Sequence, residues 1–471
     1  MLHVSTRGEA PALSFSDALL AGLARDGGLY VPQTLPRLPT AEIAALAGLP
    51  YAEVARRVIG PLADGDVAPE ALAEMIDQAY ATFRHPAVCP LTQLGDNLFV
   101  LELFHGPTLA FKDVAMQLLG RLMNHVLRLR GERATIVGAT SGDTGGAAID
   151  AFKGLDRVDM FILYPQGRVS DVQRRQMTTV GADNVHPIAV EGTFDDCQNL
   201  VKAMFNHLAF RDELGLSGVN SINWARIAAQ VVYYFSSAVS LGAPGRKVSF
   251  AVPTGNFGDV LAGHVAKRMG LPIERLMIGT NSNDILVRTL QSGAYEMQGV
   301  SATSSPSMDI QISSNFERLL FEVHDRDGAA VRRLMQSLSQ SGRFEIAEAP
   351  LARIRSEFDA AAIDEAAVAA EIGRSWREAG YLLDPHTAIG VAAARQGLQR
   401  DRATPMIVLG TAHPAKFPAA VKAASGVEPA LPPHLADLME RPEHFTLLAN
   451  DQGRIEDFIR RNARAVRGAA A

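Results

Sequence analysis

Apolar residues recur at steps of three and four along several stretches of this chain, which is the spacing of one face of an α-helix. The clearest pattern opens at Lys112 and is carried by Ala115, Leu118, Leu119, Leu122, Met123 and Val126. Before residue 90, the helical patterns FSDALLAGLARD, AEIAALAG and EALAEMIDQAYATF alternate with Pro-rich turns such as VPQTLPRLPT. The sequence therefore predicts a mainly helical amino-terminal region and, after it, a long helix that begins at Lys112.

Two longer stretches share another plan, in which a short apolar run is followed by a loop of small residues and then by a helical pattern. In RATIVGATSGDTGGAAIDAFKG, residues 134–137 predict a buried strand and residues 141–146 the loop. In KVSFAVPTGNFGDVLAGHVAKRMG, the strand is expected at 248–252 and the loop at 255–259. Strands that alternate with helices predict an α/β protein with parallel sheets and helices on both faces.

Punctuation by Pro and Gly suggests three regions. We expect a mainly helical region at 1–90, a smaller α/β domain at 91–243 and a larger α/β domain at 244–471. The first region ends in HPAVCPL, and SLGAPGRK is typical of a linker between the second and the third. A membrane span would need about 18 or more uninterrupted apolar residues. No such run occurs in the sequence, so no association with a membrane is expected.

Composition narrows the function classes. The 471 residues are 47% hydrophobic and 20% charged, which suits a soluble globular protein. The formal net charge is −6 and the basic residues are scattered among acidic ones, which argues against a nucleic-acid partner. The two cysteines have no metal-ligand spacing, so we expect buried free thiols and no metal site. No secretory signal pattern opens the chain, so we expect a cytoplasmic protein with small-molecule ligands.

Lys112 stands where a loop becomes a helix, near the positive end of the helix dipole, which disfavours an ammonium group. Apolar residues at 109–111 precede it, and burial behind them would also lower its pKa. A neutral lysine amine is a nucleophile that forms Schiff bases with carbonyl compounds, among them pyridoxal phosphate. The alternative interpretation is an ordinary surface lysine paired with the neighbouring Asp113.

The two small-residue loops are candidate anion sites. Their glycines let backbone N–H groups converge on an anion, and the helix that follows each loop adds the positive end of its dipole. Neither loop matches G-x-G-x-x-G or a P-loop, so neither carries a known nucleotide fingerprint. For either loop alone, an equally simple interpretation is that its glycines only make a tight turn. A phosphate or carboxylate role becomes the stronger hypothesis when Lys112 is considered with them.

Six motifs occur in order along the chain: HGPTLAFKD (105–113), SGDTG (141–145), NSINWARI (220–227), PTGNFGD (253–259), MDIQISSNFERLLFE (308–322) and GTAHPAKF (410–417). With SFSDALLAGLARDGGLYVP near the amino terminus, they closely resemble threonine synthases, which are pyridoxal-phosphate enzymes of fold type II. This resemblance implies the tryptophan-synthase-β-like fold, with two parallel-sheet α/β domains and an additional helical amino-terminal region. It covers about residues 14 to 420, and the last fifty residues carry no motif.

The resemblance implies how the cofactor is held. Lys112 would form the internal aldimine with pyridoxal phosphate and would also shuttle protons. The hydroxyl of Thr411 would lie beside the pyridine nitrogen, a neutral partner that disfavours transamination. The cofactor phosphate would be bound by the loop Gly255, Asn256, Phe257 and Gly258.

The resemblance also implies how the substrate is held. Its α-carboxylate would be bound by Ser141, Gly142, Asp143 and Thr144. Candidates for binding its phosphate are Asn220, Asn223 and Arg226, because a guanidinium suits a phosphate geometrically. Asn223 fits a second interpretation equally well, as the N-cap of the helix that follows it.

Four other polar residues have simpler structural interpretations. His386 and His413 each lie next to a proline at a turn, where a hydrogen-bonded structural histidine is favoured over an acid or base. Asp384 is expected to be a helix N-cap. Asp259 follows the proposed phosphate loop, where a carboxylate would repel the ligand, so we expect its side chain to cap the next helix and point away.

The function implied by the resemblance is conversion of O-phospho-L-homoserine and water to L-threonine and phosphate, the last step of threonine biosynthesis, by a pyridoxal-phosphate-dependent carbon–oxygen lyase. The nearest alternative is another enzyme on the same fold, such as a phospholyase that releases 2-oxobutyrate or a hydroxyamino-acid dehydratase. A non-catalytic phosphate-binding protein is the alternative from a different class. We expect the chain to act as a monomer or a homodimer.

Overall fold

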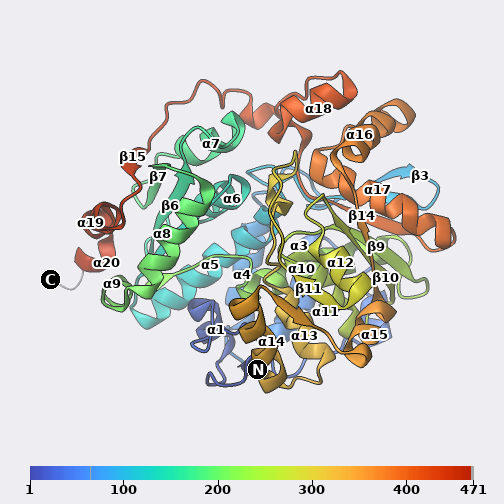
Figure 1. The fold of residues 1–471 in the computed structure, drawn as a ribbon, viewed down its shortest axis with the longest axis horizontal. Helices are drawn as coiled ribbons and strands as arrows, with labels where there is room; N and C mark the ends of the chain where they lie inside the picture. Colours follow the sequence, from blue (N-terminus) through green and yellow to red (C-terminus); the bar gives the residue numbers. More distant parts are fainter. Residues whose placement is uncertain (64, 468–471) are drawn as a thin grey trace.

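The computed structural model describes residues 1–63 and 65–467, and it arranges them as two lobes, each built around a mostly parallel sheet (Figure 1). The expected α/β class with parallel sheets is confirmed. The smaller sheet has five strands in the order β15-β7-β6-β5-β8, and each strand runs parallel to its neighbours. Its strands are β5 (Ala134–Ala139), β6 (Val158–Pro165), β7 (Val185–Glu191), β8 (Leu216–Ser217) and β15 (Thr446–Ala449).

The larger sheet has six strands in the order β13-β10-β9-β14-β4-β3, and only its edge strand β3 pairs antiparallel to its neighbour. Its strands are β3 (Leu91–Gly95), β4 (Leu98–Glu102), β9 (Val248–Pro253), β10 (Ile273–Thr280), β13 (Phe358–Ala362) and β14 (Met406–Gly410). Strands β9 and β14 are buried at every position, as expected for central strands that helices cover on both faces.

Helices α5 (Lys112–Arg130) and α10 (Trp224–Ser240) contact each other and lie between the two lobes. The helix predicted to open at Lys112 is confirmed, and all six apolar residues that predicted it are buried. The helices associated with the smaller sheet are α6 (Asp143–Phe152), α7 (Asp171–Thr178), α8 (Phe194–Asn206), α9 (Leu208–Leu214), α19 (Gln452–Asn462) and α20 (Arg464–Arg467). Those on the larger lobe are α11 (Gly258–Arg268), α12 (Ile285–Ser292), α13 (Phe316–Val323), α14 (Gly328–Ser341), α15 (Glu348–Glu357), α16 (Glu365–Ala379), α17 (Pro385–Arg400) and α18 (Pro418–Ser425).

The short elements join these layers. They are the antiparallel pair β11 (Ala294–Glu296) and β12 (Arg343–Glu345), and the 3-10 turns η2 (Pro306–Met308), η3 (Pro414–Lys416) and η4 (Pro433–Leu435). The two predicted loops are shorter than expected, because α6 already begins at Asp143 and α11 at Gly258. The later residues of each predicted loop form the first helical turn instead.

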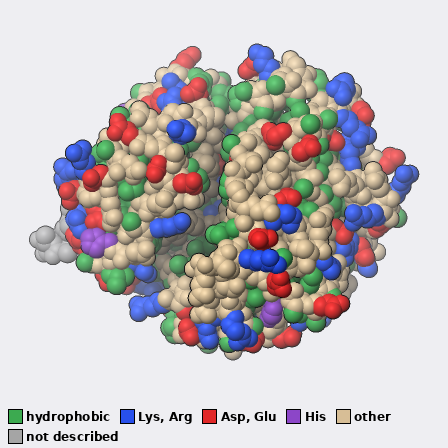
Figure 2. Space-filling view, in the orientation of Figure 1, with side chains coloured by type: hydrophobic (Ala, Val, Ile, Leu, Met, Phe, Trp, Pro, Cys, Tyr) green, Lys and Arg blue, Asp and Glu red, His purple; other side chains and the backbone are tan. Residues whose placement is uncertain are grey.

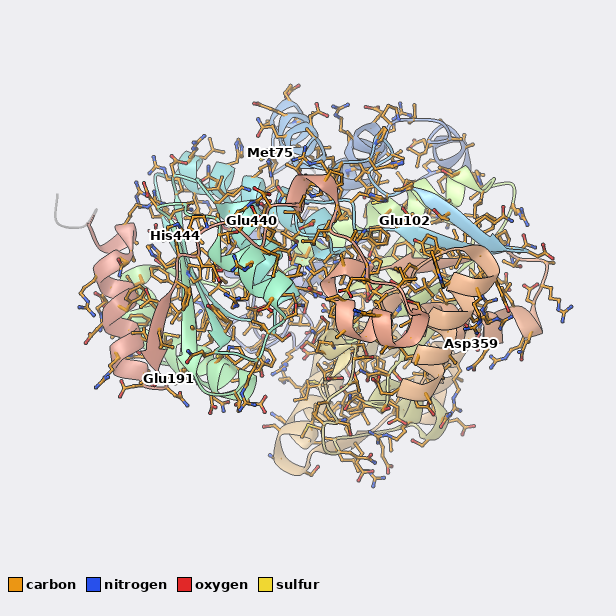
Figure 3. The ribbon with its side chains drawn as sticks, turned by 90° about the horizontal axis from the view of Figure 1, so that it is seen from above. Met75, Glu102, Glu191, Asp359, Glu440 and His444 are labelled. Atoms are coloured by element: carbon orange, nitrogen blue, oxygen red, sulfur yellow. The ribbon has the colours of Figure 1, made fainter. Side chains whose placement is uncertain are left out.

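The amino-terminal region is mainly helical, as the sequence predicts. Its elements are β1 (His3–Ser5), α1 (Phe15–Ala21), β2 (Tyr30–Pro32), α2 (Thr40–Ala44), α3 (Tyr51–Ile59), η1 (Gly60–Leu62) and α4 (Pro69–Tyr80). Seen from above, these helices, marked by Met75 of α4, lie next to the junction of the lobes, while Glu191 of β7 and Glu102 of β4 lie on different lobes (Figure 3). One hydrophobic cluster joins Val54 of α3 to Tyr233 of α10 and to both sheets. The amino-terminal region therefore shares the main core.

Two segments lie in a different lobe from the one the domain prediction gave them. Strands β3 and β4, placed at the start of the smaller domain 91–243, belong to the larger sheet, where β4 pairs with β14. The end of the chain, placed in the larger domain 244–471, returns to the other lobe, where β15 pairs with β7 (Figure 1). Domain boundaries predicted from the sequence assign both segments to the wrong lobe. Two strands that pair across more than 250 residues carry no local sequence signal of that pairing.

The carboxyl-terminal helix α19 completes the core of the smaller lobe, because Ile455 and Ile459 are fully buried there. We expect Ile455→Ala to destabilise this lobe by about 2 to 5 kcal/mol, from lost transfer free energy and the cavity left behind. Thermal unfolding followed by circular dichroism checks this, with Leu447→Ala on β15 as the control, because Leu447 is 45% exposed. Equal melting temperatures for both variants would show that α19 adds nothing to the core.

Candidate active site

A groove runs between the two lobes, and the space-filling view shows the molecule hollowed along it (Figure 2). Lys112 lies between the two glycine loops, which come from different sheets. Its Nζ is 3.7 Å from Oδ2 of Asp143, at the loop that follows β5. It is 3.5 Å from the hydroxyl of Ser307, whose carbonyl oxygen packs against Gly255 in the loop that follows β9. The tertiary structure thus brings together the lysine and both loops.

Lys112 is buried, with 8% of its surface exposed. Burial lowers the pKa of its ammonium group, and the negative charge of Asp143 opposes that shift only in part. This environment shifts Lys112 toward the neutral amine, in the direction that the sequence predicts. The alternative partner Asp113 is turned away, because its carboxylate accepts hydrogen bonds from the backbone N–H and the hydroxyl of Thr108, at 2.8 and 2.6 Å.

The loop before Lys112 is fixed to the end of β14 by backbone hydrogen bonds. The N–H of Phe111 donates to the carbonyl of Thr411 at 2.8 Å, and the N–H of His413 donates to the carbonyl of Leu109 at 3.0 Å. Leu109 has a φ of 61°, which side-chain-bearing residues rarely adopt. These contacts hold a strained backbone in place and set the position from which α5 begins at Lys112.

Asp143 occupies the first turn of α6 and is surrounded by positive groups and donors. Its Oδ1 lies 2.9 Å from Nζ of Lys416 and accepts a hydrogen bond of 2.9 Å from Nε2 of Gln173. Burial alone would raise the pKa of Asp143, but the ammonium groups of Lys416 and Lys112 outweigh burial and hold the pKa well below its usual value. An ionised carboxylate repels another, so Asp143 does not suit the expected role in binding the substrate carboxylate.

The other members of this loop do suit that role. Ser141 and Thr144 are partly exposed, and their hydroxyls form no hydrogen bond with the part of the chain that the structure describes. Gly142 has a φ of 140°, and a Cβ there would lie 2.4 Å from the side chain of Gln173. Thr140 holds the loop closed by accepting from the N–H groups of Gly142 and Gly145, at 3.0 and 2.9 Å. In the first turn of α6, the N–H groups of Asp143 and Thr144 have no acceptor among the described residues and remain available.

The loop after β9 is held by the segment that follows η2. The hydroxyl of Ser313 donates to the carbonyl of Gly255 at 2.6 Å, and the backbone N–H of Asn315 donates to the carbonyl of Asn256 at 3.0 Å. Phe257 adopts a φ of 64° and is fully buried between aromatic neighbours. These contacts aim the first turn of α11, which begins at Gly258, toward the groove. The loop has the geometry of an anion site at a helix start.

Asp259 lies in the same turn and does not contribute a full charge at neutral pH. Its Oδ1 accepts a hydrogen bond of 2.9 Å from the N–H of Val260. The expected role as helix cap is not met, because the N-cap of α11 is Phe257 and Asp259 lies within the first helical turn. Burial raises its pKa to about 7. Its repulsion of an anion bound at the loop is therefore weakened.

Thr411 directly follows β14 and has a hydroxyl without a hydrogen-bond partner. Its Oγ1 is buried and has no hydrogen-bond partner among residues 1–63 and 65–467. Its backbone N–H donates to the hydroxyl of Thr387 at 3.1 Å, which fixes the main chain from which the Thr411 side chain projects. A buried hydroxyl without a partner costs free energy unless a ligand satisfies it, so Thr411 indicates a polar ligand atom at this position.

The three candidate residues in the motif 220–227 have different environments in the structure. Arg226 is buried and forms no ion pair with the described residues; it donates only to the carbonyl of Val219 at 3.0 Å, and its Nε has no partner. Burial lowers its pKa to about 10. Asn223 is the N-cap of α10, with Oδ1 accepting from Ala225 and Nδ2 donating to Leu19, so it is not free to bind substrate. Asn220 is exposed next to this helix start.

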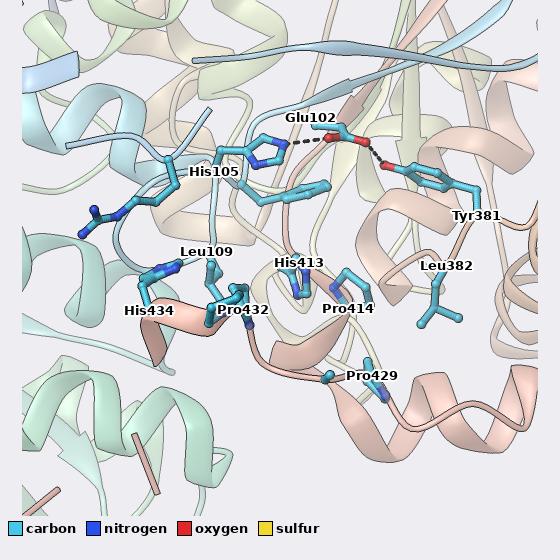
Figure 4. Close-up of a pocket in the computed structure, with 14 residues that line it drawn as sticks. Glu102, His105, Leu109, Tyr381, Leu382, His413, Pro414, Pro429, Pro432 and His434 are labelled. Atoms are coloured by element: carbon cyan, nitrogen blue, oxygen red, sulfur yellow. Dashed lines mark hydrogen bonds and ion pairs between the residues drawn. The ribbon is translucent and has the colours of Figure 1, made fainter. Parts of the chain in front are cut away.

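The two histidines are structural by their contacts. Nδ1 of His413 accepts from the N–H of Ala415 at 3.2 Å, and burial lowers its pKa to about 4. Its ring lines a separate cavity of about 520 Å³, where the carboxylate of Glu102 contacts His105 and accepts from Tyr381 at 2.8 Å (Figure 4). His386 lies against the carboxylate of Asp384. Asp384 is the N-cap of α17, as predicted.

Sequence reasoning missed Lys416, Gln173 and Asn315. Lys416 lies in a quoted motif but received no role, because its partners Thr108 and Gln176 lie 308 and 240 positions earlier. Asn315 likewise lies in a motif whose function was not assigned, although its amide donates to Asn256 and to Ser221. Only the tertiary structure places these residues around the two loops.

Comparison with known proteins connects this geometry to a family. Three family models match: threonine synthase N terminus at residues 2–80, pyridoxal-phosphate dependent enzyme at 86–410, and threonine synthase C-terminal at 387–459. The chain is 54% identical to the threonine synthase of Pseudomonas aeruginosa over 98% of both chains. The chain belongs to the threonine synthase family.

Solved structures agree with this membership. A pyridoxal-phosphate-bound threonine synthase from Brucella melitensis is 65% identical, with a TM-score of 0.97 over 98% of this chain and 100% of that one. Yeast threonine synthase is 41% identical, with a TM-score of 0.93 over 98% of both chains. The fold type II assignment is confirmed, and the chain is a pyridoxal-phosphate-dependent enzyme. Among the described residues there is no cluster that could hold a metal ion, and both cysteines are buried and free.

The residues of this threonine synthase family member fit the cofactor. The cofactor phosphate would be held by the N–H groups at the start of α11, and the pyridine nitrogen of the cofactor by the unpaired hydroxyl of Thr411. The aldehyde carbon of the cofactor would meet Nζ of Lys112, whose pKa is lowered toward the neutral amine.

The structure has no helix, within residues 1–63 and 65–467, that is long and apolar enough to cross a membrane.

We expect Gly255→Ala to weaken cofactor binding, because a Cβ there would lie 2.8 Å from the carbonyl oxygen of Ser307 and would push the loop out of place. Absorbance titration of the cofactor-free protein with pyridoxal phosphate measures the loss. Gly299→Ala is the matched control, since a Cβ at that glycine meets nothing within 4 Å. Equal affinity in the two variants would show that the Ser307 contact does not fix the loop.

Proposed function

We propose that this chain converts O-phospho-L-homoserine and water to L-threonine and phosphate. The observation that carries the proposal is the position of Lys112, buried between two loops that each have the geometry of an anion site. The substrate has a carboxylate and a phosphate, and the cofactor has a second phosphate. Two loops and the unpaired Arg226 supply a site for each of these three anions.

The two glycine loops have separate ligands in this proposal. The loop 255–258 binds the cofactor phosphate, and Thr411 contacts the pyridine nitrogen. The loop 141–144 binds the substrate carboxylate through the hydroxyls of Ser141 and Thr144 and the first N–H groups of α6. Asp143 is left out of this set, because its carboxylate contacts two lysines.

The substrate phosphate is assigned to Arg226, with Asn220 next to it. A buried guanidinium without an anion is costly, and a phosphate that accepts from its free Nε would remove that cost. Because Arg226 also lowers the pKa of Lys112, the two cations lie within electrostatic reach of each other. The leaving phosphate therefore departs from a site close to the base.

Lys112 moves the protons of the reaction. Pyridoxal phosphate, when bound, supplies the electron sink that makes loss of protons next to the substrate amine possible. Nζ of Lys112 accepts the proton from Cα, releases it to solvent and then accepts a proton from Cβ, while the C–O bond at Cγ breaks and phosphate leaves. A proton is then delivered to Cγ, and water adds its hydroxyl at Cβ while Cα regains its proton. The product has gained one water and lost one phosphate, which balances the reaction.

The test is a parallel product assay. Purified protein is incubated with pyridoxal phosphate and O-phospho-L-homoserine, and threonine, 2-oxobutyrate and phosphate are measured together. We expect threonine and phosphate in equal amounts, with Lys112→Ala slower by several orders of magnitude because both base and attachment point are lost. Borohydride reduction followed by peptide mapping should place the cofactor on Lys112. Production of 2-oxobutyrate in place of threonine would identify a phospholyase, and a label on another lysine would refute the role of Lys112.

We expect substitutions in the two loops to weaken the binding of different ligands. Gly258→Asp adds a negative charge where the cofactor phosphate binds and should give largely colourless protein, whereas Gly258→Ala is the uncharged control. The added Cβ itself meets only ordinary contacts, 3.5 Å from Nδ2 of Asn315. Absorbance titration with pyridoxal phosphate measures the difference.

Ser141→Ala and Thr144→Ala should keep the cofactor band but need more substrate, because each removes a hydrogen bond to a charged group, costing about 1.5 to 3 kcal/mol. That corresponds to roughly a tenfold to hundredfold rise in KM. Ser240→Ala at the exposed end of α10 is the control. Loss of cofactor from the Ser141 and Thr144 variants, with retention in Gly258→Asp, would show that the two anions are exchanged.

A further inference from the structure

Lys416 is a lysine whose surface is 0% exposed, in the 3-10 turn that follows β14. Its Nζ donates to the carbonyl of Thr108 at 2.7 Å and to Oε1 of Gln176 at 3.0 Å, and it contacts Oδ1 of Asp143 at 2.9 Å. Three acceptors satisfy the three N–H groups of an ammonium ion. The geometry therefore fits an ammonium group that faces one carboxylate.

Asp143 has one oxygen for each of two lysines, at different distances. Oδ1 is 2.9 Å from Lys416, which is the length of a charge-assisted hydrogen bond. Oδ2 is 3.7 Å from Lys112, which is beyond hydrogen-bond distance. The carboxylate is thus paired with Lys416, and Lys112 stands next to an anion that already has a partner.

The other charged groups near Lys112 do not take over this role. Arg226 on α10 is a cation, and Asp259 on α11 and Asp113 on the same helix as Lys112 both have a pKa raised to about 7 by burial. Asp143, whose pKa is held well below its usual value, is the carboxylate in this set that stays fully ionised at neutral pH. Which of the two lysines, Lys416 or Lys112, is held as a cation therefore depends on its pairing with Asp143.

We propose that Lys416 is a positioning residue that acts as the resident counter-ion of Asp143 and so leaves Lys112 free as a neutral amine. The inference rests on the proposed role of Lys112 as the lysine that bonds the cofactor. Without Lys416, Lys112 would be the remaining lysine in contact with the buried charge of Asp143 among the described residues, and the two would pair, because an unpaired buried carboxylate is strongly unfavourable. Lys112 would then be held as an ammonium ion, which is neither a nucleophile nor a proton acceptor.

The test compares Lys416→Gln with the unaltered full-length protein. Gln removes the charge but keeps a hydrogen-bond donor for Asp143, and Lys416→Met serves as a second uncharged variant. The first readout is the visible absorbance of the bound cofactor as a function of pH. The second, in cofactor-free protein, is the pH dependence of acylation of Lys112, measured by mass spectrometry. Both uncharged variants should move both midpoints to higher pH by about one unit or more, since removing a cation next to an ion pair acts on that scale. Acylation below the midpoint should slow about tenfold.

Three further variants separate charge from structure. Lys416→Arg keeps the charge and should keep the midpoint low. The double variant Lys416→Gln with Asp143→Asn removes the anion together with its partner, so its midpoint should return to that of the unaltered protein or below. Lys422→Gln, in an exposed lysine on α18 paired with Glu428, is the matched control and should change nothing.

The inference is refuted if the midpoint in Lys416→Gln stays unchanged or falls, or if the double variant fails to restore it. If Lys416 had only a structural role, the single and the double variant would both be less stable than the unaltered protein. The second substitution would then not return the midpoint to its original pH. Acylation uses no O-phospho-L-homoserine, so its outcome does not depend on which product the enzyme makes. A failure of the proposed reaction would instead appear in the product assay of the unaltered protein.

Discussion

The short backbone pairing between the loop 109–111 and the end of β14 is the constraint on which the site depends. It fixes where α5 begins, and therefore where the side chain of Lys112 enters the groove. The same pairing places Thr411 directly across from Phe111 and leads the chain into the turn that carries Lys416. The end of one strand thus brings an unpaired hydroxyl and a counter-ion for Asp143 to the start of α5.

The burial of Lys112 and Asp143 influences which of the two groups is charged, and so what chemistry the site can do. In water, Lys112 would be an ammonium ion and Asp143 an ordinary carboxylate, but both are removed from solvent here. Burial disfavours the charged form of each group, and neighbouring charges decide which one stays ionised. Lys416, held by a carbonyl and an amide oxygen as well as by Asp143, tips the balance so that the carboxylate keeps its charge. The cost of burying Arg226 without an anion is consistent with a site completed by its ligands.

The path of the chain explains why both lobes contribute to one site. Strand β4 pairs with β14 in the larger sheet and β3 pairs with β4 at its edge, and the chain then crosses to the smaller lobe through the loop that leads to Lys112. At the other end, the chain leaves the larger lobe after α18 and returns to add β15 to the smaller sheet. Each lobe therefore contains strands from distant parts of the sequence.

The sequence by itself determined the α/β class, the helix that opens at Lys112, the two strand–loop–helix units and, by resemblance, the family and cofactor. These features are local: periodic apolar residues, glycines at turns and ordered motifs are visible within about twenty residues. It did not determine which sheet β3, β4 and β15 join, that Asn223 is an N-cap, or that the carboxylate of Asp143 contacts two lysines. Those were decided by the tertiary structure, because strand pairing and buried charge balance depend on groups that lie hundreds of positions apart, as Lys416 and Thr108 do.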